Sequence, residues 1–264
     1  MQALIELQQR CAQLGWKSIA HRLDALLEEA SANSISYAEF LGSLLHVEEN
    51  HKQEASWNRR VRNARFPFVK TLTEFDFAAQ TSVDERRIRD LIARSFYREG
   101  HNLMFLGPPG VGKSHLSVAI ALEAIHQGQT ALFVRADEFM EAAREAAECR
   151  QVPKFLRSYA RPTILILDEV GYAPFDATSA QILFQVISKR YERGSIIITS
   201  NKSYSEWGEM LGSPVLATAI LDRLLHHSSV FNMRGDSYRL KEKIRAGVLP
   251  SSTKAPRRSG GGEG

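Results

Sequence analysis

The sequence has little cysteine, with only Cys11 and Cys149 among 264 residues. Two cysteines are too few for a disulfide framework or for a zinc site made of cysteines, so we expect free thiols in a reducing cytoplasm. Long apolar runs are also absent, since none approaches the roughly 18 residues that a membrane span needs. The start, MQALIELQQRCAQLGW, lacks the basic beginning and apolar centre of a signal peptide. We therefore expect a cytoplasmic protein with no membrane partner.

Two segments have little negative charge, although the net charge of the chain is only +4. Residues 56–70 contain no acid, and their basic side chains include Arg59, Arg60, Arg62 and Arg65. Residues 234–258 contain eight basic residues and two acids. Clustered basic charge favours a polyanionic partner, most often nucleic acid. We predict that the four arginines bind double-stranded DNA; the alternative is a solvated face whose charge is balanced by acids elsewhere in the fold.

One stretch is rich in glycine, namely FLGPPGVGKSHLSVAI at residues 105–120. Its spacing, G-x-x-x-x-G-K-[ST], is that of a phosphate-binding loop. The apolar run before it predicts a buried strand over residues 103–106, and the helical spacing after it predicts a helix over 113–126. Glycine lets successive backbone N–H groups turn toward phosphate oxygens, and the start of the helix adds further free N–H groups.

The loop therefore predicts an ATP site. Lys113 would reach the β- and γ-phosphates, and the hydroxyl of Ser114 would coordinate Mg²⁺. We expect the nucleotide to be bound by nine consecutive residues: Gly107, Pro108, Pro109, Gly110, Val111, Gly112, Lys113, Ser114 and His115.

Polar residues follow two later apolar runs. The run ILILDE ends in Asp168 and Glu169; Asp168 would hold Mg²⁺ through water, and Glu169 would polarise the attacking water as general base. Asn201 follows the run SIIITS, where its amide would orient that water against the γ-phosphate. Each residue also has a plainer interpretation, because acids are common at strand ends and asparagine is a frequent turn residue.

Helical periodicity over residues 3–30 and a capping box from Ser36 to Glu39 predict helices in the first part of the chain. The last of these would continue to about Arg65 and stop at Pro67. From residue 81 onward helices alternate with continuous apolar strands, as in a parallel sheet covered on both faces. The sequence thus predicts a doubly wound α/β domain at 67–248, preceded by a small all-helical domain at 1–66. A disordered tail is expected at 249–264.

The order GPPGVGKS, ILILDE and SIIITSN resembles that of AAA+ ATPases of the DnaA/DnaC branch, and in particular IstB-type transposition helper ATPases. The resemblance covers roughly residues 1–245 and includes ARFPFVKTLTEFDF at 64–77, ILDRLLHHSSV at 220–230 and GDSYRLKE at 235–242. It implies an AAA+ P-loop domain that hydrolyses ATP with Mg²⁺. It assigns the motif residues as follows: Lys113 and Ser114 to Walker A, Asp168 and Glu169 to Walker B, and Asn201 to sensor I.

The resemblance also implies roles outside these motifs. Arg223 corresponds to the arginine that reaches into the nucleotide of a neighbouring subunit, which implies a homo-oligomer with ATP at its interfaces. Arg239 falls where a further basic residue near the phosphates is sometimes assigned. Phe75, Asp76 and Phe77 lie where this branch packs against adenine, although two aromatics that flank an acid are also typical of a plain core.

Two uses of the ATP remain open. A transposition helper assembles on target DNA with ATP and stimulates its cognate transposase, whereas a helicase loader delivers a replicative helicase to DNA. A zinc-bearing loader N-terminus needs clustered cysteines, which this sequence lacks. A helical start followed by Arg59, Arg60, Arg62 and Arg65 is the arrangement of the IstB type. The sequence therefore favours the helper, with the loader as the alternative; a metabolic ATPase or kinase is disfavoured because no substrate-binding insertion is evident.

Overall fold

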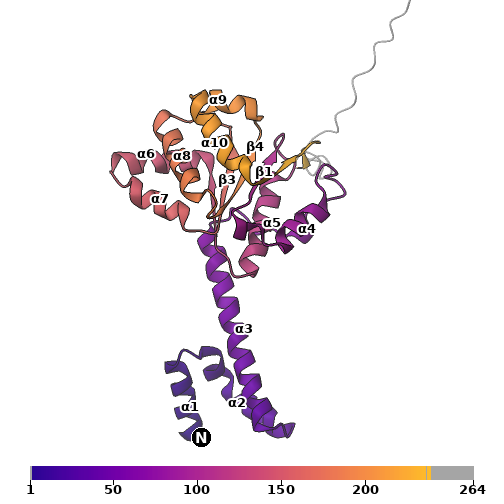
Figure 1. The fold of residues 1–264 in the computed structure, drawn as a ribbon. Helices are drawn as coiled ribbons and strands as arrows, with labels where there is room; N and C mark the ends of the chain where they lie inside the picture. Colours follow the sequence, from indigo (N-terminus) through magenta and orange to yellow (C-terminus); the bar gives the residue numbers. More distant parts are fainter. Residues whose placement is uncertain (1, 236, 239–264) are drawn as a thin grey trace, which may run out of the picture. The chain divides into compact units, whose positions relative to one another are not determined.

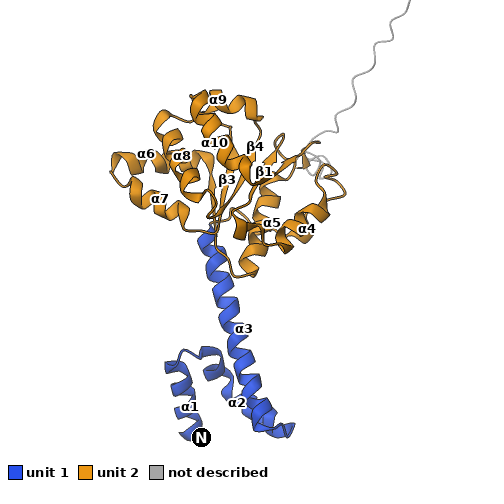
Figure 2. Ribbon diagram, in the orientation of Figure 1, with its two compact units in different colours: residues 1–64 blue, residues 65–264 orange. Residues whose placement is uncertain are grey.

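The computed structural model describes residues 2–235, 237 and 238. The chain forms two compact units, Met1–Ala64 and Arg65–Gly264, which Figure 2 shows in different colours. Arg239 and the tail expected at 249–264 lie outside the described residues, so the expectations for them stay predictions. Among the described residues, no helix has both the length and the apolar character that crossing a membrane requires.

The first unit is all helical, with elements α1 (Gln2–Gln13), α2 (Lys17–Ala32) and α3 (Tyr37–Ala64). Helix α2 contacts both of the others and buries Ile19, Leu23 and Leu26, which share one face of the helix. The predicted capping box before α3 is confirmed. The Ser36 amide donates to Glu39 Oε2 (2.9 Å), and the Glu39 amide donates to Ser36 Oγ (3.3 Å).

The prediction that the basic helix includes Arg65 is wrong. Helix α3 ends at Ala64, and Arg65 takes a left-handed backbone conformation with a φ of +57°. Pro67 disfavours a helical conformation at Phe66, the residue before it, and α3 ends before it with Arg65 in the left-handed conformation that commonly follows a helix. Arg65 therefore cannot share a helix face with the other three predicted arginines, which stay on α3.

The second unit is built on one parallel sheet. Its strands are β1 (Asn102–Leu106), β2 (Ala131–Arg135), β3 (Ile164–Val170), β4 (Ser195–Ser200) and β5 (Ser228–Asn232). Their order across the sheet is β2-β3-β4-β1-β5, and every neighbouring pair is parallel. Strands β1 and β4 are buried along their whole length, as expected where both faces are covered. The predicted α/β fold with a central parallel sheet is confirmed.

Helices cover both faces of this sheet (Figure 1). They are α4 (Glu85–Ala93), α5 (Lys113–His126), α6 (Ala136–Glu148), α7 (Val152–Ala160), α8 (Ala177–Arg190), α9 (Trp207–Met210) and α10 (Pro214–His226), with 3₁₀ turns at Leu72–Glu74, Phe96–Glu99 and Tyr204–Glu206. Helices α6 to α10 form one core with alternate strand residues such as Met104 and Val134. Helix α5 packs on the other face, because successive strand side chains point to opposite sides.

Periodicity does not predict α7, α10 or β5. Strand β5 contains only two apolar residues, and its burial alternates because it is an edge strand of the described sheet. Helix α10 does have a start signal in the sequence: the Ser213 hydroxyl caps it by accepting from the Leu216 amide (3.3 Å), and Pro214 occupies its first position.

A buried arginine holds the amino ends of the central strands. Arg190, the last residue of α8, is 1% exposed. Its guanidinium donates to five carbonyl oxygens: those of Tyr159 (2.9 Å), Ala160 (3.3 Å), Pro162 (2.8 Å), Thr163 (2.9 Å) and Ser195 (2.7 Å). Burial lowers the pKa of Arg190 to about 10, so the group stays charged at neutral pH. Since each buried carbonyl without a donor costs about 1–3 kcal/mol, this side chain stabilises the junction of α7, β3 and β4.

Candidate functional site

The strand order brings three polar segments to one edge of the sheet. The glycine-rich loop follows β1, Asp168 and Glu169 lie near the carboxyl end of β3, and Thr199 lies near that of β4. Strand β4 lies between β3 and β1, and all three run in the same direction. Because the carboxyl ends of parallel strands meet at one edge, segments far apart in the sequence become neighbours there.

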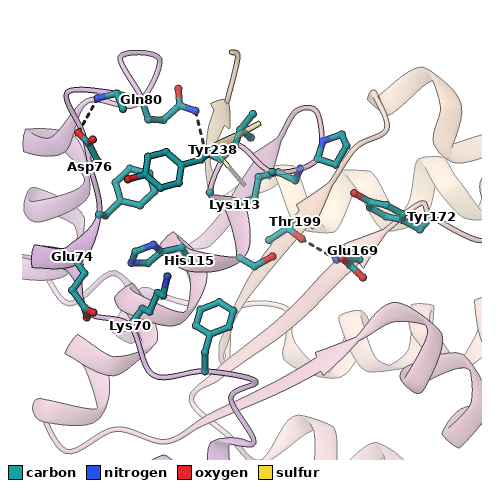
Figure 3. Close-up of a pocket in the computed structure, with 18 residues that line it drawn as sticks. Lys70, Glu74, Asp76, Gln80, Lys113, His115, Glu169, Tyr172, Thr199 and Tyr238 are labelled. Atoms are coloured by element: carbon teal, nitrogen blue, oxygen red, sulfur yellow. Dashed lines mark hydrogen bonds between the residues drawn. The ribbon is translucent and has the colours of Figure 1, made fainter. Parts of the chain in front are cut away.

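A cavity of about 550 Å³ opens at this edge, within the size range of small-ligand pockets. Figure 3 shows Gln80 and His115 on one side of it and Glu169 and Tyr172 on the other. Most of the predicted nucleotide site lines this cavity, namely Pro109, Gly110, Val111, Gly112, Lys113, Ser114, His115 and Glu169.

The loop places Lys113 at the start of α5. Its Nζ donates to the carbonyl oxygens of Gly107 and Pro108, both at 2.7 Å, which ties these two loop residues to the lysine. Gly112, just before α5, has a φ of +99°, and a Cβ there would lie 2.7 Å from the ring of Phe75. Glycine at position 112 is therefore required by the backbone conformation and by the neighbouring ring, independently of any phosphate.

A set of hydrogen bonds joins α5, β3 and β4. The Ser114 hydroxyl donates to both carboxylate oxygens of Asp168, at 2.8 and 3.0 Å. The Thr199 hydroxyl donates to Asp168 Oδ1 at 2.5 Å and accepts from the backbone N–H of Glu169 at 2.9 Å. Asp168 and Thr199 are both buried. The two predicted magnesium ligands thus meet, and Thr199 links them to the residue predicted as general base.

A bulge in β3 changes the direction in which the Glu169 side chain points. The pairing of β3 with β4 shifts register between Leu167 and Val170, and Glu169 has a φ of +59°. Consecutive residues of a regular strand face opposite sides, and a bulge changes that alternation. Glu169 can therefore line the cavity while Asp168, its neighbour, contacts Ser114. Arg135, at the end of β2, lies 3.3 Å from Glu169 Oε2 and balances part of the negative charge of the two carboxylates.

The sequence leaves open whether Phe75 belongs to the core or to the nucleotide pocket, and its position in the structure is compatible with both. Phe75 is buried, and it also lines the cavity together with Asp76. Its ring packs edge-on against Phe77 and His115, with centroid distances of 4.7 and 5.2 Å. Contact of these residues with adenine stays a prediction.

His115 differs from the rest of the predicted phosphate-binding loop. Its Nε2 lies 3.1 Å from the carbonyl oxygen of Thr71, to which it donates. Burial lowers the pKa of His115, so the imidazole is neutral at neutral pH. It therefore adds no positive charge for a phosphate group.

Two predicted catalytic residues are not among the described residues that line the cavity. Asn201 is exposed, directly after β4, and its side chain lies beside Gly171, which follows β3. Arg223 lies on α10, where it donates to the carbonyl of Ala219 at 2.8 Å and stacks over the ring of Phe184 at 4.8 Å. An arginine that acts on a neighbouring subunit is not expected to line the cavity of its own chain. The roles of both residues stay predictions.

Sequence reasoning missed Thr199 and Arg135. A signal for Thr199 was available, because a hydroxyl inside the buried run SIIITS needs a hydrogen-bond partner. Arg135 pairs in register with Asp168 on adjacent strands. Finding it requires the strand order, which single-sequence periodicity does not give.

Comparison with known proteins identifies the group to which the site belongs. The model of the family described as IstB-like ATP binding protein matches residues 9–246. The chain belongs to this family. It is 49% identical over 233 residues to the candidate ATP-binding protein of insertion sequence IS5376 from Geobacillus stearothermophilus, covering 88% of this chain and 93% of that protein. It is 41% identical over 248 residues to the candidate ATP-binding protein of insertion sequence IS21 from Pseudomonas aeruginosa, covering 94% of each.

The fold is similar to the crystal structure of the DnaC helicase loader, with a TM-score of 0.50 and 22% identity over 56% of this chain and 87% of that one. At this identity the similarity concerns the fold alone. The predicted membership of the IstB-like family is confirmed, the fold is similar to that of the DnaC helicase loader, and the family is one of ATP-binding proteins.

The buried hydroxyl of Thr199 gives a first prediction. Thr199→Val removes the hydrogen bond to Asp168 and leaves the Glu169 amide without its acceptor, whereas Thr199→Ser keeps the hydroxyl. By analogy with groups that orient metal ligands, we expect the valine variant to lose about 10- to 100-fold in the Mg²⁺-dependent ATPase activity that the sequence predicts, with a destabilisation of about 1–3 kcal/mol. ATPase rates over a Mg²⁺ titration and urea unfolding measure the two effects. Equal activity of the valine and serine variants would contradict this role.

Proposed function

We propose that the chain hydrolyses ATP to ADP and phosphate in the cavity at the carboxyl edge of the sheet. The observation that carries this proposal is the meeting of Ser114, Asp168 and Glu169 beside Lys113. Lys113 supplies a positive charge to the β- and γ-phosphates, while Glu169 accepts a proton from the attacking water. The bulge in β3 supports this assignment, because it frees the Glu169 carboxylate from the hydrogen bonds that occupy Asp168.

The same residues suit Mg²⁺. The Ser114 hydroxyl and the Asp168 carboxylate offer oxygen atoms, which Mg²⁺ prefers as ligands, and they lie 2.8 Å apart. Asp168 is 5% exposed, and a buried carboxylate is stabilised by a nearby cation. When bound, Mg²⁺ neutralises charge that develops on the phosphate oxygens. Ser114 and Asp168 would hold it, and Thr199 would fix the orientation of the Asp168 carboxylate.

The use of ATP that we favour is transposition. In this proposal the chain assembles on double-stranded DNA with ATP and stimulates the transposase of its own insertion sequence. Support comes from relatives at 49% and 41% identity that are named for insertion sequences. A replicative helicase loader is the alternative, and its support is a similarity of fold alone.

The first unit is the proposed DNA-binding part. Arg59 and Arg62 are exposed and lie one turn apart on α3, while Arg60 is half-buried. Two exposed arginines at this spacing can each contact a backbone phosphate. Arg65, the first residue of the second unit, is also exposed and stays a candidate contact.

The second prediction tests hydrolysis and helper activity together. Lys113→Ala should abolish ATP binding, because Lys113 contacts the phosphates of bound ATP. Glu169→Gln should keep ATP binding and lose at least about 100-fold in hydrolysis, because the general base acts in the chemical step. The measurements are calorimetric ATP binding, ATPase rate and transposase-catalysed strand transfer into a target plasmid. The exposed Glu141→Gln on α6 is the matched control.

The outcomes separate the two parts of the proposal. Equal loss of ATP affinity in both variants would reject the roles of Lys113 and Glu169. If strand transfer runs at the same rate with and without the wild-type chain, and the chain binds a replicative helicase, the helper function is rejected and the loader is favoured. The proposal that the chain hydrolyses ATP would stand in that case.

The third prediction concerns Arg223, which we propose acts on the ATP of a neighbouring subunit. Arg223→Ala should lower the ATPase rate by about a thousandfold, because such an arginine stabilises charge on the transferring phosphoryl group. Mixing it with Lys113→Ala should restore part of the rate, since some interfaces then combine an intact arginine with an intact loop. The control mixture of Lys113→Ala with Glu169→Gln should show no recovery, because each subunit then has a defect in its own cavity. Near-normal turnover of Arg223→Ala alone would reject the role.

The fourth prediction concerns DNA. Replacing Arg59 and Arg62 by alanine should weaken ATP-dependent duplex binding. The slope of log binding constant against log salt concentration should become less steep by about 1.8, or about 0.9 per lost phosphate contact. The loss should be similar across DNA sequences, because phosphate contacts do not read bases. The matched control is Arg10→Ala with Arg22→Ala, two exposed arginines of the same unit. A slope that equals the wild-type slope would mean that this face does not bind DNA.

A further inference from the structure

A second cluster of side chains suited to a cation lies at the other edge of the sheet. Glu192 belongs to the turn between α8 and β4, whereas His226 ends α10 and His227 precedes β5. Strands β4 and β5 begin at Ser195 and Ser228, so these residues lie at the amino ends of the strands. The ATP cavity, by contrast, is at the carboxyl ends. The cluster is therefore separate from the nucleotide site.

The potential ligand atoms converge. Glu192 Oε1 lies 3.7 Å from His227 Nε2 and 3.9 Å from His226 Nδ1, and one ligand atom from each of the three residues lies within 4.8 Å of the others. Separations of 3.7 and 3.9 Å are longer than a direct hydrogen bond. They are slightly longer than the separation of about 3.3 Å between ligand atoms that each lie about 2.0–2.1 Å from a tetrahedral zinc ion. For these two pairs an inward movement of about half an ångström suffices, and the side chains are 51 to 55% exposed.

The backbone that carries these side chains is held in place. Glu192 has a φ of +57°, two residues after the buried Arg190. The buried side chain of Asn102 accepts from the Ile196 amide (2.8 Å) and donates to the Leu224 carbonyl (3.1 Å), while its backbone N–H donates to the His227 carbonyl (2.7 Å). One residue thus ties the start of β4 to the end of α10. Such support sets the distance between the two ligand-bearing segments before any ion binds.

We propose that Glu192, His226 and His227 bind a divalent transition-metal cation, with Zn²⁺ as the probe. Two imidazoles and one carboxylate form a ligand set that zinc accepts in proteins, with water in the remaining position. The Tyr191 hydroxyl lies 2.7 Å from His226 Nδ1, and this hydrogen bond has to give way when the ion binds. The bound ion would join the turn after α8 to the end of α10, one turn beyond Arg223.

Calorimetric titration of the full chain with ZnCl₂, after removal of any affinity tag and chelator, tests the proposal. We expect one Zn²⁺ per chain. His226→Ala and His227→Ala should each weaken binding by more than about tenfold, since even residues that only support a ligand cost 10- to 100-fold in metal affinity. Glu192→Gln, which keeps the shape of the side chain and removes its charge, should also weaken binding. His21→Ala and His51→Ala, both exposed and remote in sequence, are the matched controls and should bind as the wild type does.

Thermal unfolding gives a second measurement. Saturating Zn²⁺ should raise the melting temperature of the wild type and not that of the His226→Ala/His227→Ala double variant, while metal-free melting temperatures confirm that the variants are folded. Two results would overturn the proposal: no zinc binding by the wild type, or stoichiometric binding that persists in the double variant.

Discussion

The hydrogen bond from Thr199 to Asp168 connects two neighbouring strands to the helix that follows the glycine-rich loop. Asp168 receives the Thr199 hydroxyl from β4 and the Ser114 hydroxyl from α5, while the Glu169 amide donates back to Thr199. A buried carboxylate with both donors in place has one preferred orientation, because every other orientation leaves polar groups unpaired. The positions of Ser114, Asp168 and Glu169 relative to one another therefore depend on the hydroxyl group of Thr199, which follows three isoleucines in β4.

The bulge in β3 allows two adjacent acids, Asp168 and Glu169, to lie at the same end of the sheet. In a regular strand Asp168 and Glu169 would point to opposite faces of the sheet. The left-handed conformation of Glu169 lets one acid stay with Ser114 and the other line the cavity. Arg135 meets Glu169 there and reduces the repulsion between the carboxylates. Strain of this kind persists where surrounding contacts hold it, and the Thr199 hydroxyl, which accepts from the Glu169 amide, is such a contact.

Sequence patterns predict the parts of this fold that are local. The loop at 107–114, the apolar strands and the capping box at Ser36 depend on residues close together in the chain, and the structure contains each of them. The meeting of Ser114 with Asp168 was also predictable, because loops after parallel strands share one edge of the sheet. Contacts that depend on strand order or on tertiary neighbours were not. Arg135 beside Glu169, the edge strand β5 and the carbonyl cluster around Arg190 belong to this group. Arg65 was misjudged because α3 ends at Ala64, and Arg65 takes the left-handed conformation that commonly follows a helix.

The carboxyl ends and the amino ends of the strands differ in structure, and α10 runs between them. At the carboxyl edge, side chains are arranged around an open cavity, whereas at the amino edge Arg190 and Asn102 close the structure with buried hydrogen bonds. Asn102 holds the carbonyl of Leu224, the residue after Arg223, so the backbone next to this arginine is fixed to the sheet. A displacement of about 1 Å in a catalytic group can cost about a hundredfold in rate. In the role proposed for it, on the nucleotide of another subunit, Arg223 gains nothing from contacts within its own cavity. Its accuracy has to come from the rigidity of its own helix, and the amino edge of the sheet supplies that rigidity.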